Sequence, residues 1–178
     1  MIALVTGGAA SGKSACAERL ACALGSRRTY LATMAHGGTE AQARIAKHRA
    51  QRAGLGFVTL ECPSGTLTPA LEASGGGVIL LEDLGNLVSN ALFAPDGGMA
   101  DADEVLSRLE TEVMGLADRF DHVVIVGNEV GSEGPSPYES TRIWVRLIGS
   151  LACRLAARCD TVAEVVCGCP QVLKGRLP

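Results

Sequence analysis

The sequence is poor in aromatic residues, which make up only 3% of its 178 residues. Hydrophobic residues nevertheless reach 47%, so a core has to be built almost entirely from Val, Leu, Ile and Ala. A chain of this length can bury a full-sized core within one domain. This composition is typical of a buried parallel sheet covered by helices.

The chain also lacks an excess of basic residues and any long apolar run. Its net charge of −3 argues against the basic surfaces that bind nucleic acid or attach electrostatically to membranes. No apolar run approaches the length needed to span a bilayer, and the start, MIALVTGG, has neither the basic residues nor the cleavage site of a signal peptide. We therefore expect a cytoplasmic protein without nucleic-acid partners and without membrane insertion.

A regular cysteine framework is missing as well. The seven cysteines are odd in number and irregular in spacing, which indicates reduced thiols rather than disulfides. The segment CGC at residues 167–169 raises the question of a metal site, but zinc sites usually combine two C-x2-C pairs. We interpret these cysteines as small apolar residues near the end of a strand.

What the sequence does contain is a regular alternation of apolar runs and helical patterns. Strands are expected over residues 2–6, 29–33, 56–61, 78–83, 122–131 and 161–168. Helices are expected over residues 13–24, 40–53, 66–73, 84–93, 104–120 and 139–159, with a surface loop over 94–103. This order predicts an α/β fold, a single P-loop NTPase-like domain over residues 1–178. Its sheet should be mostly parallel with helices on both faces, as in RecA-like proteins.

Polar residues gather where the apolar runs end. In parallel α/β sheets, ligands bind at the carboxyl ends of the strands. We therefore look for the functional site among the polar residues at these ends, which are Thr6, Thr33, Glu61, Glu82, Asp83, Asn128 and Glu129.

The segment GGAASGKS matches the phosphate-loop pattern G-x4-G-K-[ST], directly after a strand and at the start of a helix. Backbone N–H groups and the helix dipole favour phosphate oxygens in this setting. Lys13 adds a charge at the β- and γ-phosphates, and the Ser14 hydroxyl can bind Mg²⁺. The motif predicts binding of a nucleoside triphosphate by Gly7, Gly8, Ala9, Ala10, Ser11, Gly12, Lys13 and Ser14.

A second group for Mg²⁺ is expected at the end of the strand VILLE. Glu82 occupies the usual place of the acidic residue that holds Mg²⁺ through water in such folds. Asp83 is the alternative, although strand alternation would point the two side chains to opposite sides. An acid at this place can also simply cap the helix that follows. We prefer Glu82 as the metal-binding residue.

The segment ARIAKHRAQR places His48 among four cations on a helical pattern. At about 100° per residue, Arg44, His48 and Arg52 form one stripe. The neighbouring charges lower the pKa of the imidazole, so the ring stays neutral near pH 7 and can attack phosphorus to form a phosphoramidate. A solvated basic helix face is the alternative, and spacing alone does not decide. The small residues expected to pack on the protein body are Ala43, Ala46, Ala50 and Ala53.

In this order, the motifs resemble those of the bifunctional adenosylcobinamide kinase/adenosylcobinamide-phosphate guanylyltransferase family, which assembles the nucleotide loop of cobalamin. The resemblance rests on LVTGGAASGKS, TYLATM, ARIAKHRAQR, FVTLECP, VILLEDLGNLVSNALF and VGNEVG, and extends to the closing EVVCGCPQVLKG. Its most specific element is R-I-x-x-H-x-x-x-R, which is matched by Arg44, Ile45, His48 and Arg52.

The resemblance implies two reactions. A nucleoside triphosphate, ATP or GTP, phosphorylates adenosylcobinamide with Mg²⁺ as cofactor. GTP then guanylylates His48, which passes GMP to adenosylcobinamide phosphate. The resemblance also implies a homo-oligomer, a trimer whose subunits share the corrinoid cleft. The implied catalytic residues are His48 and Lys13, and the implied nucleotide contacts outside the phosphate loop are Ala32, Thr33, Met34, Arg49, Ala50, Gln51, Arg52, Glu61 and Glu82.

The chain departs from the family pattern in its last long helix. Where the family commonly has R-D-x-x-G-R-x-N, alignment on Gly149 gives Val145, Arg146, Ser150 and Ala152 here. Two other functions are therefore considered. One is a small-molecule kinase that uses the phosphate loop alone, and the other is a nucleotide-binding regulatory protein whose corrinoid site has changed.

Overall fold

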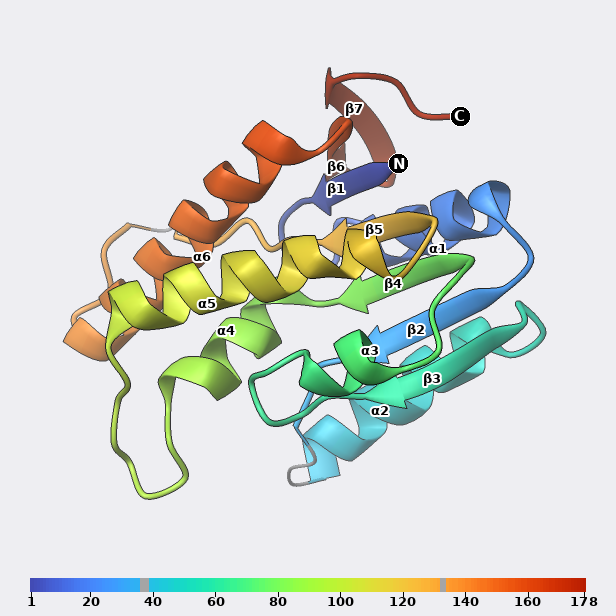
Figure 1. Ribbon diagram of the computed structural model, residues 1–178. Coiled ribbons are helices and arrows are strands. Elements are labelled where there is room, and N and C mark those ends of the chain that lie inside the picture. Colours follow the sequence, from blue (N-terminus) through green and yellow to red (C-terminus); the bar gives the residue numbers. More distant parts are fainter. Residues whose placement is uncertain (36–38, 132–133) are drawn as a thin grey trace.

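The computed structural model describes residues 1–35, 39–131 and 134–178, without the side chains of Thr39, Glu40, Ala41, Arg44, Lys47, His48 and Gln51. Helices cover both faces of one seven-stranded sheet (Figure 1). The strands are β1 (Ile2–Thr6), β2 (Arg28–Ala32), β3 (Phe57–Glu61), β4 (Val78–Glu82), β5 (His122–Val126), β6 (Thr161–Val166) and β7 (Cys169–Lys174). The helices are α1 (Lys13–Leu24), α2 (Thr39–Arg52), α3 (Thr68–Glu72), α4 (Leu84–Leu92), α5 (Ala102–Gly115), the short 3-10 helix η1 (Leu116–Asp118) and α6 (Glu139–Arg158).

The strand order is β3-β2-β4-β5-β1-β6-β7. Every neighbouring pair is parallel except β6 and β7, which are antiparallel. The predicted α/β class with a mostly parallel sheet is therefore confirmed. Because β5 lies between β1 and β4, the strand before the phosphate loop and the strand ending in Glu82 are not adjacent.

Two apolar cores lie on the two faces of the sheet, since successive strand residues point to opposite sides. One core packs α3, α4, α5 and α6 against residues such as Leu4, Leu81 and Ile125, and the other packs α1 against residues such as Val5 and Leu80. The largest fully buried side chains are all leucines and isoleucines. Tyr30 and Phe120 are also buried, but the two cores consist mainly of aliphatic side chains, as the composition predicts.

The strand expected over 122–131 is wrong in extent, because β5 ends at Val126. The Gly127 N–H still donates to the carbonyl of Val5 at 2.8 Å, but the Glu129 N–H donates to the carbonyl of Gly7 at 3.1 Å. The chain thus leaves the sheet and runs along the start of the phosphate loop.

The strand expected over 161–168 is also wrong, because this segment turns back on itself. β6 ends at Val166, and Cys167 and Gly168 adopt φ angles of 50° and 80°. Two successive residues of positive φ make the two-residue turn typical of a β-hairpin. The hairpin continues into β7, an edge strand that tolerates Pro170.

The cysteines carry no disulfide, as expected: all seven are free, and Cys167 and Cys169 are exposed. Over the residues that the structure describes, no group of three or more His, Cys, Asp and Glu side chains is placed to hold a metal ion. A search of the same residues finds no helix with the length and apolar character needed to cross a membrane.

Helix ends follow local capping. α5 begins at Ala102, earlier than expected, because the Asp101 carboxylate accepts the backbone N–H groups of Asp103 and Glu104 at 3.0 and 2.9 Å. α3 begins at Thr68 rather than at residue 66, because the Thr66 hydroxyl instead bonds to Thr68 and to α5.

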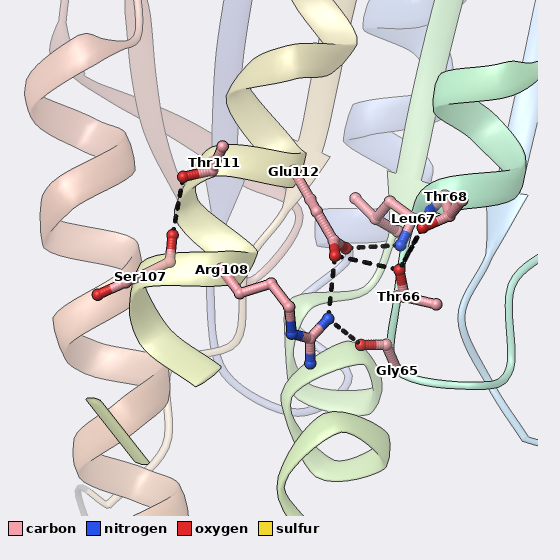
Figure 2. Close-up of polar contacts among 8 residues, drawn as sticks. All are labelled: Gly65, Thr66, Leu67, Thr68, Ser107, Arg108, Thr111 and Glu112. Carbon is pink, nitrogen blue, oxygen red and sulfur yellow. Dashed lines mark hydrogen bonds and ion pairs between the residues drawn. The ribbon is translucent and has the colours of Figure 1, made fainter. Parts of the chain in front are cut away.

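Figure 2 shows how α5 holds the segment between β3 and α3. The Glu112 carboxylate accepts the backbone N–H of the buried Leu67 at 2.7 Å and the hydroxyl of Thr66 at 3.1 Å. It also accepts Arg108 at 3.0 Å, and Arg108 in turn donates to the carbonyl of Gly65 at 3.0 Å. The Glu112 carboxylate therefore accepts hydrogen bonds both from the segment before α3 and from Arg108 on its own helix.

We expect Glu112→Ala to lower the free energy of unfolding by about 2 kcal/mol, because it leaves the buried N–H of Leu67 without an acceptor. Chemical denaturation measures the loss. The control is Glu110→Ala on the same helix as Glu112. It removes an exposed ion pair with Arg154 of α6 and should cost less than about 1 kcal/mol. Equal losses in the two variants would contradict this account of Glu112.

Candidate functional site

A cavity of about 540 Å³ opens where the strands end, between the phosphate loop and α2. In the sheet register Glu61, Ala32 and Glu82 lie side by side at the carboxyl ends of β3, β2 and β4. The lining consists of Ala9, Ala10, Ser11, Gly12, Lys13, Ser14, Ala15, Tyr30, Ala32, Met34, Ile45, Arg49, Arg52, Thr59, Glu61, Glu82, Asp83, Asn86 and Asn128.

The phosphate loop, residues 7–14, is packed between two other segments. Its Ser11 carbonyl accepts the N–H of Gly168 in the β6–β7 turn at 2.8 Å, and its Gly7 carbonyl accepts the N–H of Glu129. The Lys13 ammonium donates to the carbonyl of Gly8 at 3.1 Å. The loop is therefore held from both sides with its lysine folded over it.

Steric contacts explain why two positions of this loop are glycines. A Cβ at Gly12 would lie 3.2 Å from the Cα of Gly168, and Gly12 has φ of 91°, a conformation that residues with a Cβ rarely adopt. A Cβ at Gly7 would lie 2.6 Å from both the Ser11 hydroxyl and the Val165 carbonyl. Both glycines are thus required by the close approach of the hairpin to the loop.

Ser14 and Glu82 meet at the floor of the cavity. The Ser14 hydroxyl donates to one carboxylate oxygen of Glu82 at 2.6 Å, and the other oxygen, Oε2, is buried without a hydrogen-bond partner in the described structure. Burial raises the pKa of Glu82 to about 7, while the hydrogen bond from Ser14 works in the opposite direction. A carboxylate short of partners beside a hydroxyl is a donor pair that fits a divalent cation.

Asp83 takes the role of a helix cap. Its carboxylate accepts the backbone N–H of Asn86 at 2.8 Å at the start of α4, and accepts Asn128 at 3.2 Å. Both acids line the cavity, so the expectation that they face opposite sides is wrong. Strand alternation stops at Glu82, where β4 ends, and no longer governs Asp83.

Thr33 lies behind the cavity wall rather than in it. It is fully buried, and its hydroxyl bridges the carbonyls of Glu82 and Asp83, each at 2.9 Å, while accepting the N–H of Asp83 at 2.8 Å. Its flanking residues Ala32 and Met34 do line the cavity. Thr33 therefore joins the end of β2 to the end of β4, and its buried hydroxyl is absent from the cavity lining.

The opposite wall is formed by α2. Ile45, Arg49 and Arg52 line the cavity at i, i+4 and i+7 and thus share one helix face. Arg49 forms an ion pair of 2.7 Å with Glu61. Arg52 is buried, with its guanidinium carbon 3.3 Å from the ring centroid of Tyr30, a cation–π contact.

His48 belongs to the backbone of α2, three residues after Ile45 and four before Arg52, but its side chain lies outside the described residues, as does that of Gln51. Its position in the helix places residue 48 next to Ile45, Arg49 and Arg52, the α2 residues that line the cavity. Ala50 is exposed and is absent from the cavity lining. The predicted alanine face is wrong too, because Ala43, Ala46, Ala50 and Ala53 are all exposed.

Asn86 and Tyr30 line the cavity although the sequence did not predict them as site residues, whereas Asn128 was expected only as a polar residue near a strand end. Asn86 and Asn128 surround the capping carboxylate of Asp83, and Tyr30 lies under Arg52. Burial, followed by the nearby Glu82, raises the pKa of Tyr30 well above its usual range, so the phenol stays protonated. Of these, only Asn128 carried a signal in the sequence, through its place after an apolar strand.

A second cavity, of about 620 Å³, lies between the start of α5 and α6. Its lining includes Arg146 and Ser150, two of the four departures from the family pattern. None of the four departures belongs to the lining of the phosphate-loop cavity as the structure describes it. The departures therefore leave that cavity unchanged.

Two comparisons of the sequence with known proteins give the same family. The profile of the family described as cobinamide kinase / cobinamide phosphate guanyltransferase matches residues 3–173. The bifunctional adenosylcobalamin biosynthesis protein CobP of Pseudomonas aeruginosa is 36% identical over 174 residues, which cover 97% of this chain and 96% of that protein.

Among solved structures, the fold is similar to that of a prototypical ATPase from the type III secretion system of pathogenic bacteria, with a TM-score of 0.52 and 11% identity over 92% of this chain. The chain spans 50% of the length of that ATPase chain, and this likeness shows the fold alone. The family match runs over nearly the whole chain. The chain therefore belongs to the cobinamide kinase / cobinamide phosphate guanyltransferase family.

Proposed function

We propose that both reactions of the family take place at the cavity between the phosphate loop and α2. The observation that carries this proposal is that the loop residues and the α2 residues Ile45, Arg49 and Arg52 line one cavity. A triphosphate bound by the loop would therefore extend along the helix that contains His48.

In the kinase reaction, the hydroxyl oxygen of adenosylcobinamide attacks the γ-phosphorus. The bond from that phosphorus to the β–γ bridging oxygen breaks, and the nucleoside diphosphate leaves. Lys13 and the loop N–H groups stabilise the charge on the transferring group. Ser14 and Glu82 would hold Mg²⁺, which when bound neutralises charge on the phosphate oxygens.

In the guanylyl transfer, an imidazole nitrogen of His48 attacks the α-phosphorus of GTP, and pyrophosphate leaves with the bridging oxygen. A phosphate oxygen of adenosylcobinamide phosphate then attacks the same phosphorus and breaks the P–N bond. The product is adenosylcobinamide-GDP, and His48 is regenerated. The arginines on the same helix, Arg49 and Arg52, are suited to bind phosphate oxygens.

Three further expectations accompany this function. The choice between ATP and GTP in the kinase reaction, the cytoplasmic location and the trimer with a shared corrinoid cleft stay predictions of the sequence and of its family resemblance.

We expect GTP labelled at the α-phosphorus to leave an acid-labile, base-stable label on the wild-type protein, and His48→Ala to remove it. The control is His122→Ala, since His122 lies at the amino end of β5, beside Met1 and away from the cavity, so this variant should label normally. Peptide mapping locates the adduct. No label on the wild-type protein would rule out the guanylyl-histidine intermediate, and a label that survives in His48→Ala would place the adduct on another residue.

We expect Lys13→Ala to lower the turnover of both reactions by about 10²–10³-fold, because both need the charge over the phosphate loop. Steady-state assays of phosphorylation and of GMP transfer measure the loss. Arg19→Ala is the matched control, since Arg19 is an exposed cation on the same helix. Turnover that survives in Lys13→Ala would show that the loop does not hold the triphosphate.

A further inference from the structure

The segment after β5 brings a glutamate to the start of the phosphate loop. The backbone N–H of Glu129 donates to the carbonyl of Gly7 at 3.1 Å. One residue earlier, Asn128 lines the cavity, and its side-chain oxygen accepts the N–H of Gly85 at 2.8 Å. These two hydrogen bonds hold the segment in place on either side of the Asn128–Glu129 peptide. Glu129 therefore has a fixed position beside the loop.

The side chain of Glu129 extends over the loop. A Cβ at Gly8 would lie 3.8 Å from Glu129 Oε2. The carbonyl of the same glycine accepts the Lys13 ammonium at 3.1 Å. The lysine of this motif reaches the β- and γ-phosphates. The Glu129 carboxylate thus lies close to the end of the triphosphate from which the phosphoryl group is transferred.

This carboxylate is available for a ligand. Glu129 is exposed, and in the part of the chain that the structure describes its carboxylate has no hydrogen-bond or ion-pair partner. The other acids at the strand ends already have partners. Glu82 accepts a hydrogen bond at the floor of the cavity, Asp83 caps α4, and Glu61 belongs to an ion pair. Glu129 is therefore the acid near the loop whose carboxylate can meet a second substrate from solvent.

Transfer of a phosphoryl group to a hydroxyl has a requirement that the loop does not meet. A carboxylate commonly orients the attacking hydroxyl and accepts its proton. The Lys13 ammonium and the loop N–H groups are donors without an acceptor site, so they cannot do this. A carboxylate beside the γ-phosphate also repels it, so Glu129 gains nothing from triphosphate binding alone. An acceptor hydroxyl placed between the two gives the carboxylate a hydrogen-bond donor.

We infer that Glu129 is the general base of the kinase reaction. The hydroxyl oxygen of adenosylcobinamide attacks the γ-phosphorus while its proton passes to a carboxylate oxygen of Glu129. The bond from the γ-phosphorus to the β–γ bridging oxygen breaks, and the nucleoside diphosphate leaves with that electron pair. Because Glu129 is exposed, its carboxyl then returns the proton to water. This inference rests on the proposed location of the kinase reaction at the phosphate loop.

The first test compares wild type with Glu129→Gln, which keeps the size and polarity of the side chain but cannot take up the proton. We expect kcat for phosphorylation of adenosylcobinamide to fall by about 10²-fold or more. The KM for the nucleoside triphosphate should change by less than about threefold. Glu129→Asp keeps a carboxylate on a shorter side chain and should retain more activity than Glu129→Gln. Phosphorylation at the wild-type rate in Glu129→Gln would overturn the inference.

A second measurement separates the base from a residue that merely supports the loop. Loss of a loop support would weaken triphosphate binding and lower both reactions. Loss of a negative charge beside the γ-phosphate should instead leave the affinity for a non-hydrolysable GTP analogue unchanged or slightly tighter. Formation of the adduct from GTP labelled at the α-phosphorus, which involves no acceptor hydroxyl, should change by less than about threefold. Weaker binding in calorimetry, with equal losses of both reactions, would refute the role as a base.

The matched control is Glu72→Gln, which removes an exposed carboxylate at the end of α3, outside the described lining of the phosphate-loop cavity. It should change neither reaction. Lys13→Ala distinguishes the two ways of failing. If Lys13→Ala phosphorylates normally, the kinase reaction does not use the loop and the proposed function fails. If Lys13→Ala is impaired while Glu129→Gln is not, only the role of Glu129 fails.

Discussion

The site depends on the confinement of the phosphate loop between the β6–β7 turn and the segment after β5. Hydrogen bonds from Gly168 and Glu129 fix the loop carbonyls of Ser11 and Gly7. Loop carbonyls held in this way cannot turn inward, which suits a loop whose N–H groups bind phosphate. The remaining groups are placed relative to this frame, since Glu82 meets the loop at Ser14 and Thr33 joins the end of β2 to that of β4.

The two walls of the cavity are built on different physical principles. The phosphate loop follows β1 and Glu82 ends β4, two strands whose apolar residues are buried in the cores on both faces of the sheet, where packing leaves few alternative positions. The described side-chain contacts that attach the α2 wall come from Arg49 and Arg52. An exposed ion pair such as Arg49–Glu61 contributes only about 0–1 kcal/mol, whereas Arg–phosphate contacts are charge-assisted and frequently bidentate. Arg49 can therefore exchange its carboxylate for a phosphate oxygen at small cost.

Features that depend on neighbouring residues were predictable from the sequence. The phosphate loop, Ser14 and the alternation of strands and helices follow from short patterns, and the helix Lys13–Leu24 has the predicted bounds. Features that need distant residues were not. The sequence indicated only that Tyr30 belongs to a strand. Its contact with Arg52 depends on the packing of the end of α2 beside β2. The Cys167–Gly168 turn was missed because a cysteine seldom adopts positive φ. The predicted alanine face was wrong because the described contacts of α2 with the protein come from its arginines.

The difference between the two cavity walls bears on how one cavity can serve both proposed reactions. Phosphoryl transfer and guanylyl transfer break bonds at opposite ends of a triphosphate, so a single rigid set of groups cannot be best placed for both. Lys13 and Ser14 at the start of α1 and Glu82 at the end of β4 suit the end held by the loop. The helix-borne residues Arg49 and Arg52 lie across the cavity from them and accompany residue 48. The stacking of Arg52 on Tyr30 joins the end of this second wall to β2, while neither apolar core contains a described residue of α2.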